Sequence, residues 1–500
     1  MELSVVYSRA LTGIDAPLVQ VETHLSNGLP AFHIVGLPET AVRESKDRVR
    51  CAILNSHFNF PDRRITVNLA PADLPKEGGR FDLPIALGIL SASGQLPVDH
   101  LHQHEFLGEL ALDGSLRPVP GAVAAASAAL GAQRRLVVAT TSAPLAALVP
   151  GSEVLAAPDI LTLCAHLNGS QALEPAMCEP AHNRYIYPDL QEVTGQEGAR
   201  RALEIAASGA HNLLLSGPPG TGKTLLASRL PGILPPPTPQ EAMTGLVLRD
   251  AYNGADNGGY VFTRPFRSPH HSASAAALAG GGSKPRPGEI SLAHGGVLFL
   301  DELPEFNRHC LEVLREPMES GEITLARARH KISYPARFQL IAAMNPCPCG
   351  YLGDTERACR CTLQQVQNYR ARISGPLLDR IDLHIPVYRL PPAQLLASGQ
   401  GGEPSSTVRG RVSRCRALQE ERQGCANAYL TPRQLASVCT LGNNERKALE
   451  KAATRMRLSG RGLHRTLRVA RTIADLEEVN SIETRHLSEA LGYRDHQAEQ

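Results

Sequence analysis

The feature that most constrains the fold is an eight-residue run, Gly-Pro-Pro-Gly-Thr-Gly-Lys-Thr at 217–224, between a short apolar stretch and a helical one. Its glycines let backbone N–H groups curve around an anion without a Cβ in the way. The helix that follows points its positive end at the same anion. This order of strand, loop and helix predicts a parallel α/β sheet that binds a nucleoside triphosphate. The predicted nucleotide-binding residues are Gly217, Pro218, Pro219, Gly220, Thr221, Gly222, Lys223 and Thr224.

Two further predicted strands of this sheet end in polar residues. Val297–Leu300 runs into Asp301 and Glu302, and Leu340–Ala343 runs towards Asn345. With the Thr224 hydroxyl, Asp301 could hold Mg²⁺, while Glu302 and Asn345 could orient an attacking water. The alternatives are an ordinary acidic turn after a core strand and a plain strand-end cap at the amide.

The chain has 500 residues, more than one hydrophobic core usually supports, so we expect several domains. Residues 1–167 alternate strand-like runs, such as Val19–Leu25 and Arg64–Leu69, with helical runs such as Ala122–Leu130 and Leu145–Leu148. Segments rich in Gly, Pro and Ser then predict two linkers. The expected domains are 1–167, a linker at 168–188, an α/β core at 189–390, a linker at 391–406, and a helical part at 407–500.

Composition excludes several classes of protein. A formal charge of +2 excludes a uniformly basic nucleic-acid coat but allows a local basic groove. The absence of Trp and an aromatic content of 4% exclude base stacking as the dominant mode of binding. No apolar stretch reaches the roughly 20 residues that span a bilayer, and the eleven cysteines do not form the pattern of a secreted disulfide scaffold. We therefore expect a cytoplasmic protein without membrane contact.

Four of the cysteines form two C-x-C pairs, Cys347-Pro-Cys349 and Cys359-Arg-Cys361. Four thiolates held by two short clips can satisfy tetrahedral Zn²⁺, which predicts about one zinc per chain. The alternatives are a group of free thiols and a disulfide, the latter disfavoured in a reducing compartment.

A β-hairpin is predicted at 321–335, with Arg327, Arg329 and Lys331 near its tip. An exposed hairpin with ordinary basic residues would show the same pattern.

Together these motifs resemble a known family. Asp301–Glu302, Asn345 and the stretch Tyr369–Asp382 are similar to the magnesium-chelatase and MCM-like branch of AAA+ ATPases. Phe266–Ser272 and Gly288–Val297 strengthen the match. Over its whole length the chain resembles the magnesium-chelatase-like AAA+ ATPases of the YifB/ComM competence-protein family.

The resemblance implies a homohexameric ring that uses ATP and Mg²⁺. It also implies that the hairpin at 321–335 projects into the pore of the ring, where Arg327, Arg329 and Lys331 would contact DNA phosphates without reading sequence. It makes Arg380 an arginine finger donated to a neighbour's γ-phosphate, for which an ion pair with Asp379 or Asp382 is the alternative. It also matches Arg461 to the sensor-2 arginine of the helical lid, and leaves the arginines at 465, 468 and 471 as a solvated or nucleic-acid-facing stripe. The expected catalytic residues are Lys223, Asp301, Glu302, Asn345, Arg380 and Arg461.

The N-terminal region is similar to the Lon-protease/ribosomal-S5 type of α+β domain. Pro75–Phe81 lines up with the segment that carries the protease's nucleophilic serine, but Arg80 stands in the serine's place. The segment Gly108–Ala125 lacks the lysine that would act as base. Because the dyad needs both partners, we expect no proteolysis, and a scaffold or a DNA-contacting platform instead.

The expected fold is thus α/β: a Lon/S5-like α+β domain, an AAA+ P-loop core and a C-terminal helical lid. The expected function is a DNA translocase or helicase that drives branch migration and the integration of incoming single-stranded DNA in natural transformation. Its partners would be single-stranded and branched DNA and recombination proteins. The alternative is a chelatase-type motor that remodels a protein partner. The Lon-like leader and the paired cysteines favour the DNA-directed function.

Overall fold

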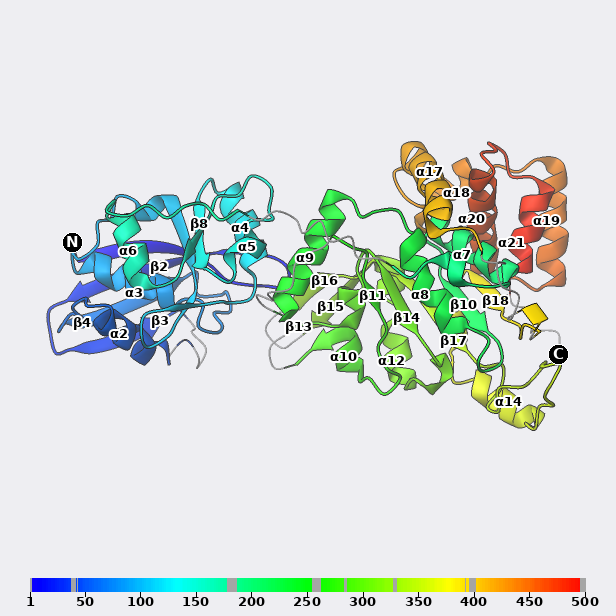
Figure 1. The fold of residues 1–500 in the computed structure, drawn as a ribbon, viewed down its shortest axis with the longest axis horizontal. Coiled ribbons are helices and arrows are strands. Elements are labelled where there is room, and N and C mark those ends of the chain that lie inside the picture. The colour runs from blue at the N-terminus through cyan, green and yellow to red at the C-terminus, as the bar shows by residue number, and fades with distance from the viewer. Residues whose placement is uncertain are drawn as a thin grey trace. The chain divides into compact units, whose positions relative to one another are not determined.

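The computed structural model describes residues 2–36, 42, 44–177, 187–253, 262–282, 286–326, 331–391, 393–394 and 402–494 (Figure 1). The chain forms two compact units. The first contains Met1–Arg184 and Pro239–Val261, and the second contains Tyr185–Thr238 and Phe262–Gln500.

The first unit is built on a mixed sheet of seven strands in the order β3-β4-β2-β1-β5-β8-β9. Strand β2 runs antiparallel to both of its neighbours, β1 and β4. The other neighbouring pairs, β3–β4, β1–β5, β5–β8 and β8–β9, are parallel. Alternate residues of β2 are buried, as its apolar–polar alternation predicts. The strands are β1 Leu3–Arg9, β2 Leu18–Ser26, β3 Ala31–Val35, β4 Arg64–Ala70, β5 His104–Leu107, β6 Glu109–Leu110, β7 Leu116–Arg117, β8 Arg135–Ala139 and β9 Val154–Ala157.

Helices cover this sheet, and every residue of α3 is buried. The predicted helix at Ala122–Leu130 is confirmed, while the one expected at Leu145–Leu148 is a four-residue helix that begins two residues earlier. The helices are α2 Ser45–Asn55, α3 Asp82–Ala92, η1 Leu101–Gln103, α4 Ala122–Gly131, α5 Ala143–Ala146, α6 Ile160–Leu167 and α9 Pro239–Asn253.

Helix α9 belongs to the first unit although the chain on both sides of it belongs to the second. From the sequence we placed these residues in the α/β core, and the structure assigns them elsewhere. Helix α9 packs against α4, and the Asp250 carboxylate, 2% exposed, accepts a hydrogen bond of 2.9 Å from the Val123 N–H. The free N–H groups at the start of α4 favour a carboxylate, which explains this docking.

The second unit contains the predicted parallel sheet, in the order β11-β14-β17-β10-β18. The expected strands at 213–215, 297–300 and 340–343 are its β10, β14 and β17. Because all five strands run the same way, their carboxyl ends share one edge, where ligands bind in open α/β sheets. The strands of the unit are β10 Leu213–Ser216, β11 Phe266–Arg267, β12 Gly280–Gly281, β13 Arg286–Pro287, β14 Val297–Leu300, β15 Glu322–Ala326, β16 Lys331–Pro335, β17 Gln339–Met344 and β18 Leu383–Pro386.

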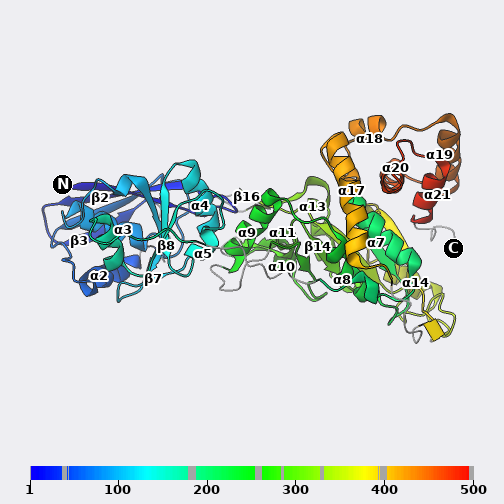
Figure 2. The same ribbon diagram turned by 45° about the horizontal axis from the view of Figure 1, so that its top comes forward.

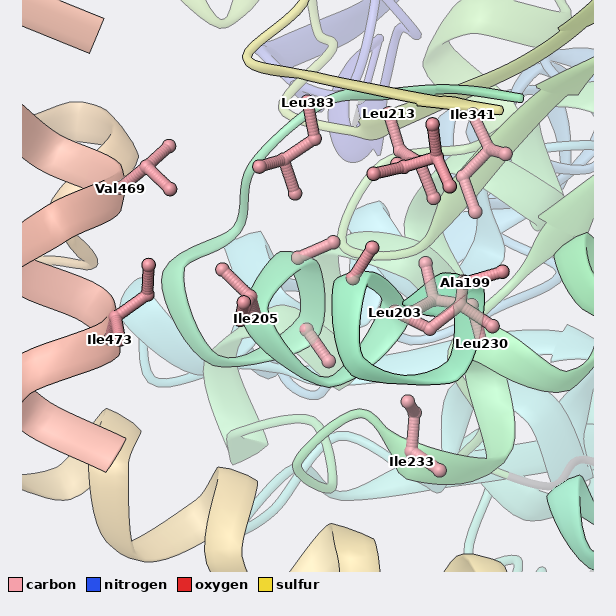
Figure 3. Packing of buried hydrophobic residues seen from close by; sticks show 14 of the residues in the cluster. Ala199, Leu203, Ile205, Leu213, Leu230, Ile233, Ile341, Leu383, Val469 and Ile473 are labelled. Carbon is pink, nitrogen blue, oxygen red and sulfur yellow. The ribbon is translucent and has the colours of Figure 1, made fainter. Parts of the chain in front are cut away.

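Helices α17 to α21 form the predicted C-terminal helical part, and α17 lies beside α7 in both views (Figures 1 and 2). Val469 and Ile473 of α20 face α7, whose Leu203 and Ile205 pack beneath the sheet (Figure 3). Helix α18 begins at Pro432 as predicted, because Thr431 caps it and forms a capping box with Gln434 in its first turn. None of the described helices combines the length and the apolar character that crossing a bilayer requires.

The helices of the second unit are η2 Leu190–Glu192, α7 Glu197–Gly209, α8 Lys223–Ile233, α10 Ala275–Ala279, α11 Glu289–Leu292, η3 Leu303–Glu305, α12 Arg308–Val313, α13 Pro317–Ser320, α14 Leu363–Arg370, α15 Gly375–Leu378, α17 Ser405–Gln423, η4 Asn427–Tyr429, α18 Pro432–Val438, α19 Asn443–Arg455, α20 Gly460–Leu476 and α21 Thr484–Gly492.

Candidate functional site

The phosphate-binding loop connects β10 to α8, as predicted. Gly222 has a φ of +87°, a left-handed conformation that favours glycine, directly before Lys223 begins α8. Gly217 is needed for a different reason: a Cβ there would lie 2.1 Å from the carbonyl oxygen of Val387. One glycine therefore lets the loop turn into α8, and the other lets it pack against the residue that follows β18.

Lys223 is 8% exposed and its ammonium group points back into the loop. Its Nζ donates to the carbonyl oxygens of Gly217 and Pro218 at 2.7 and 2.9 Å, and to Oδ1 of Asn345 at 3.1 Å. Burial lowers the pKa of Lys223 from its usual value, opposed by the charges of Asp301 and Glu302. A cation in such a site gains from the arrival of an anion.

The two residues expected to hold Mg²⁺ are in contact: the Thr224 hydroxyl donates to Oδ2 of Asp301 at 2.7 Å. Oxygen atoms of this kind are the ligands that Mg²⁺ prefers. Glu302 has a φ of +53°, and its N–H donates to Oδ1 of Asp301. Oε2 of Glu302 lies 3.4 Å from Nδ1 of His271, a residue to which the sequence analysis assigned no role.

A cavity of about 410 Å³ brings the predicted nucleotide site together. It lies at the carboxyl ends of β10, β14 and β17, where the three strand-end motifs meet. Its lining residues are Pro219, Gly220, Thr221, Gly222, Lys223, Thr224, Asp301, Glu302, Met344 and Asn345. The residues present fit a nucleoside triphosphate with Mg²⁺, since they supply a buried cation, backbone N–H groups and paired oxygen ligands.

Arg380 lies after α15, and its side chain does not line this cavity. Its guanidinium donates to the carbonyl oxygen of Pro376 at 2.6 Å and pairs with Glu319 at 2.5 Å. The expected alternative partners were Asp379 and Asp382, so the partner observed is a different one. Burial lowers the pKa of Arg380, and its Nε has no hydrogen-bond partner within the described part of the chain.

Arg461 is exposed in the first turn of α20 and lines a second cavity of about 410 Å³ together with Glu319, Arg465 and Arg468. The structure therefore places Arg461 beside the partner of Arg380 and not in the lining of the nucleotide cavity.

The next three arginines of α20 are not freely solvated, since each has a partner within the protein. Arg465 pairs with the buried Asp382 at 2.7 Å, and Arg468 donates to the carbonyl oxygen of Leu430. Arg471 is 1% exposed and pairs with Asp475. Burial alone would raise the pKa of Asp382. The charge of Arg465 and an interaction with the buried His211 outweigh burial and hold this pKa far below its usual range.

The four predicted cysteines converge on one point. Their sulfur atoms all lie within 4.8 Å of one another, and Cys359 Sγ is 3.6 Å from both Cys347 Sγ and Cys349 Sγ. Tetrahedral Zn²⁺ with Zn–S bonds of about 2.3 Å requires sulfur separations of about 3.8 Å. A disulfide requires about 2.05 Å, so the geometry fits a shared metal and not a disulfide.

Among the four cysteines, only Cys349 has surroundings that favour the thiolate, whereas the pKa values of Cys347, Cys359 and Cys361 are raised. Backbone N–H groups of Arg360 and Tyr351 donate to the Cys349 sulfur and lower the pKa of its thiol to about 6. Burial instead raises the pKa of Cys347. Thiolates, not thiols, ligate metal ions, and Cys349 loses its proton more readily than an ordinary cysteine.

The predicted basic hairpin is present, since β15 pairs antiparallel with β16 from Glu322↔Pro335 to Ala326↔Lys331. Lys331 is exposed at the first position of β16. Arg327 and Arg329 lie outside the described residues.

In the segment Pro75–Phe81, Arg80 is 7% exposed and donates to the carbonyl oxygen of Pro120 at 2.9 Å. Burial lowers the pKa of Arg80 to about 10. A guanidinium that stays protonated offers no nucleophile. The nearby start of α4 binds Asp250 through Val123.

Comparison with known proteins agrees with this geometry. The family model for magnesium chelatase, subunit ChlI, matches residues 189–395, the model for subunit ChlI of Mg-chelatase matches 21–142, and the model for the ChlI C-terminal part matches 402–494.

The chain is 51% identical over 502 residues to competence protein ComM of Haemophilus influenzae, covering 99% of this chain and 98% of that protein. It is 50% identical over 494 residues to the YifB protein of Salmonella typhimurium, covering 99% and 97%. The chloroplastic magnesium-chelatase subunit ChlI of Nicotiana tabacum is 26% identical over 202 residues, or 40% of this chain and 42% of that protein. This chain therefore belongs to the YifB/ComM family of magnesium-chelatase-like AAA+ proteins, a membership that implies ATP and Mg²⁺ as ligands and ATP hydrolysis as the activity.

Proposed function

We propose that this chain is the protomer of a homohexameric ring that hydrolyses ATP to move DNA through its centre, and so drives branch migration and the integration of incoming DNA. The observation that carries the proposal is the single cavity lined by Lys223, Thr224, Asp301, Glu302 and Asn345. The name of the Haemophilus influenzae relative, competence protein ComM, supports a role in competence for this chain.

Hydrolysis needs positive charge at the phosphates and an oriented water molecule. Lys223 would exchange its present carbonyl partners for phosphate oxygens when ATP enters. Thr224 and Asp301, already in contact, would hold Mg²⁺, which when bound spreads the negative charge of the phosphates. Glu302 would orient the attacking water and take its proton, and Asn345 would position the same water from the neighbouring strand.

Arg380 supplies the trans contact in this proposal. To reach a neighbour's γ-phosphate it must leave Glu319, whose side chain is 52% exposed. The Arg380 side chain is only 8% exposed, so this pair is not an ordinary surface ion pair. A triphosphate carries several negative charges against the single charge of Glu319, so it can displace this carboxylate. Assembly would then switch on hydrolysis, because each finger completes the site of the next protomer.

The trans contact is tested with mixed rings. Arg380→Ala alone should bind ATP normally but lose turnover, whereas Glu302→Gln should retain the finger and lose turnover at its own site. Rings mixed from the two variants should regain part of the hydrolysis, at interfaces that pair an intact site with an intact finger. No recovery in mixed rings would show that Arg380 does not act in trans.

DNA would contact the hairpin formed by β15 and β16, where the exposed Lys331 would meet a phosphate. Lys331→Ala should then reduce the slope of log affinity against log salt by roughly one. Lys447→Ala is the matched control, since Lys447 is exposed on α19 away from the hairpin. Equal slopes in the two variants would count against the hairpin as the DNA contact.

The deciding experiment measures ATP turnover with and without single-stranded DNA, and then strand displacement on a branched substrate. A translocase should show stimulation and displacement, and Glu302→Gln should abolish displacement. A protein that shows neither would not be a DNA translocase.

The second candidate is a motor that remodels a protein partner, favoured by the similarity to the tobacco magnesium-chelatase subunit. Such a motor should hydrolyse ATP faster in the presence of its protein partner and should not respond to DNA. The turnover measurement above therefore separates the two functions.

We also propose Zn²⁺ as the ion of the four-cysteine cluster, supported by the sulfur separations and by the lowered pKa of Cys349. Metal analysis of freshly purified protein should return about one zinc per chain. Cys349→Ser should lower this value, whereas Cys51→Ser, a cysteine outside the cluster, should not. Absence of zinc from reduced protein would overturn the proposal.

A further inference from the structure

The cysteine loop lies directly against the phosphate-binding loop. A Cβ on Gly350, the residue after Cys349, would come 2.8 Å from Cδ of Pro219 and 3.9 Å from Cγ of Asn345. Pro219 lines the nucleotide cavity, and the amide oxygen of Asn345 accepts a hydrogen bond from Lys223. Two residues of the nucleotide site, Pro219 and Asn345, are therefore packed close to the turn that carries the first pair of cysteines.

Besides the cysteines, the Asp354 carboxylate helps to hold this loop, since it accepts hydrogen bonds from the N–H groups of Glu356 and Arg357 and pairs with Arg389. The segment 345–362, between β17 and α14, contains no helix or strand. Gly350 has a φ of +85°, and its N–H donates to the carbonyl oxygen of Cys347 at 2.9 Å. The second clip, Cys359–Cys361, meets the first one only through its sulfur and backbone N–H contacts. Loops of this length without secondary structure are uncommon in compact domains, and a metal that closes such a loop can add to its order.

We infer that a zinc-class ion held by the four cysteines positions Pro219 and Asn345 for nucleotide binding, so that the metal site controls the affinity for ATP. The ion fixes the two clips, the clips fix Gly350, and Gly350 supports the phosphate-binding loop from outside the cavity. The metal thus acts by holding the conformation of the loop, and the four cysteines do not contact the phosphates. This inference rests on the proposed zinc occupancy and is independent of DNA translocation.

Two glycine variants isolate the contact. Gly350 and Gly353 lie in the same loop with φ of +85° and +79°, so an added side chain strains both backbones similarly. Only at Gly350 does the new Cβ meet Pro219, whereas at Gly353 it meets open space. Gly350→Ala should weaken binding of a fluorescent ATP analogue about tenfold relative to Gly353→Ala, with one zinc retained per chain in both. Equal affinities with full zinc would overturn the inference and leave the zinc proposal standing.

Removal of the metal is the second arm, measured on the full-length chain by hydrogen exchange. Zinc withdrawn with a thiol reagent and a chelator, or lost through Cys349→Ser, should speed backbone exchange in residues 217–224 while leaving β14 unchanged. Readdition of Zn²⁺ to the chelated protein should restore protection and ATP affinity. Metal-free protein that binds ATP as tightly as the zinc-loaded protein would overturn the inference. Protein that never contains zinc would overturn the zinc proposal and this inference with it.

Discussion

Gly217→Ala tests whether the phosphate-binding loop is built against β18. The added Cβ would lie 2.1 Å from the Val387 carbonyl oxygen and 3.1 Å from its carbon, both backbone atoms that cannot rotate away. Since a Cβ rarely approaches any atom within 3.0 Å, the backbones must separate by about 0.9 Å (3.0 minus 2.1). That movement breaks the 2.7 Å hydrogen bond from the Val387 N–H to the carbonyl oxygen of Ser216.

The magnitude follows from these two effects. Overpacking a tight contact costs about 1–3 kcal/mol, and the lost hydrogen bond costs about 1 kcal/mol. We therefore expect Gly217→Ala to lower the free energy of unfolding of the second unit by about 2–4 kcal/mol, and to weaken ATP binding because the loop is displaced.

Urea unfolding of the full-length chain, followed by circular dichroism and by proteolysis of the second unit, measures the first quantity. Titration with a fluorescent ATP analogue measures the second. Gly198→Ala in α7 is the control, since its Cβ meets open space and a helical Gly→Ala change stabilises by up to about 1 kcal/mol. The reasoning is refuted if Gly217→Ala unfolds within about 0.5 kcal/mol of the original chain and binds ATP equally well.

Three further substitutions probe separate parts of the chain. Phe299→Ala removes a ring that is 1% exposed, so urea unfolding should show a loss of about 3–5 kcal/mol, and a loss below 1 kcal/mol would contradict the packing. Glu319→Gln removes the carboxylate that pairs with Arg380, whose guanidinium still donates to the carbonyl oxygen of Pro376. ATP turnover of assembled protein should then rise about two- to fivefold, whereas Glu316→Gln, at an exposed neighbour, should leave it unchanged. A rate no higher than that control counts against the exchange. Burial raises the pKa of Asp250 from 3.8 to about 6, so the stability due to this group is complete below pH 3.8 and is lost as pH rises through 6. In thermal unfolding between pH 4.5 and 7.5, Asp250→Asn should flatten the decline for the first unit, and the exposed Asp99→Asn should not; identical profiles would refute this assignment.

Much of the second unit could be predicted because its signals are local. A run of four apolar residues between Gly296 and Asp301 predicts β14 at its observed bounds, and the spacing of glycines around Lys223 predicts the loop after β10. Parallel strands then place their carboxyl ends together, which is why the strand-end residues meet in one cavity. The pairing of two C-x-C clips was equally readable, since short clips bring sulfur atoms together whatever the rest of the fold does.

The errors came from contacts between residues far apart in the chain. Asp250 docks on Val123, 127 positions away, and its own segment carries no sign of this partner. The ion-pair partner of Arg380 is likewise distant in sequence, since it is Glu319 and neither of the nearer carboxylates, Asp379 and Asp382. The inward arginines of α20 could have been partly foreseen, because Asp475 stands four residues after Arg471 and makes a helical ion pair.

Helix α9, which belongs to the first unit but lies between two stretches of the second, limits how the chain can be cut into fragments. Because the first unit takes residues from two stretches of chain, with part of the second unit between them, the polypeptide passes from one unit to the other three times, at 184–185, 238–239 and 261–262. No single cut can release both units whole. A fragment ending near residue 184 would leave the start of α4 without the carboxylate that caps it, and one beginning there would carry α9 with its packing face bare. To study either half alone, this helix should be moved by circular permutation or grafted, and the chain should not simply be truncated.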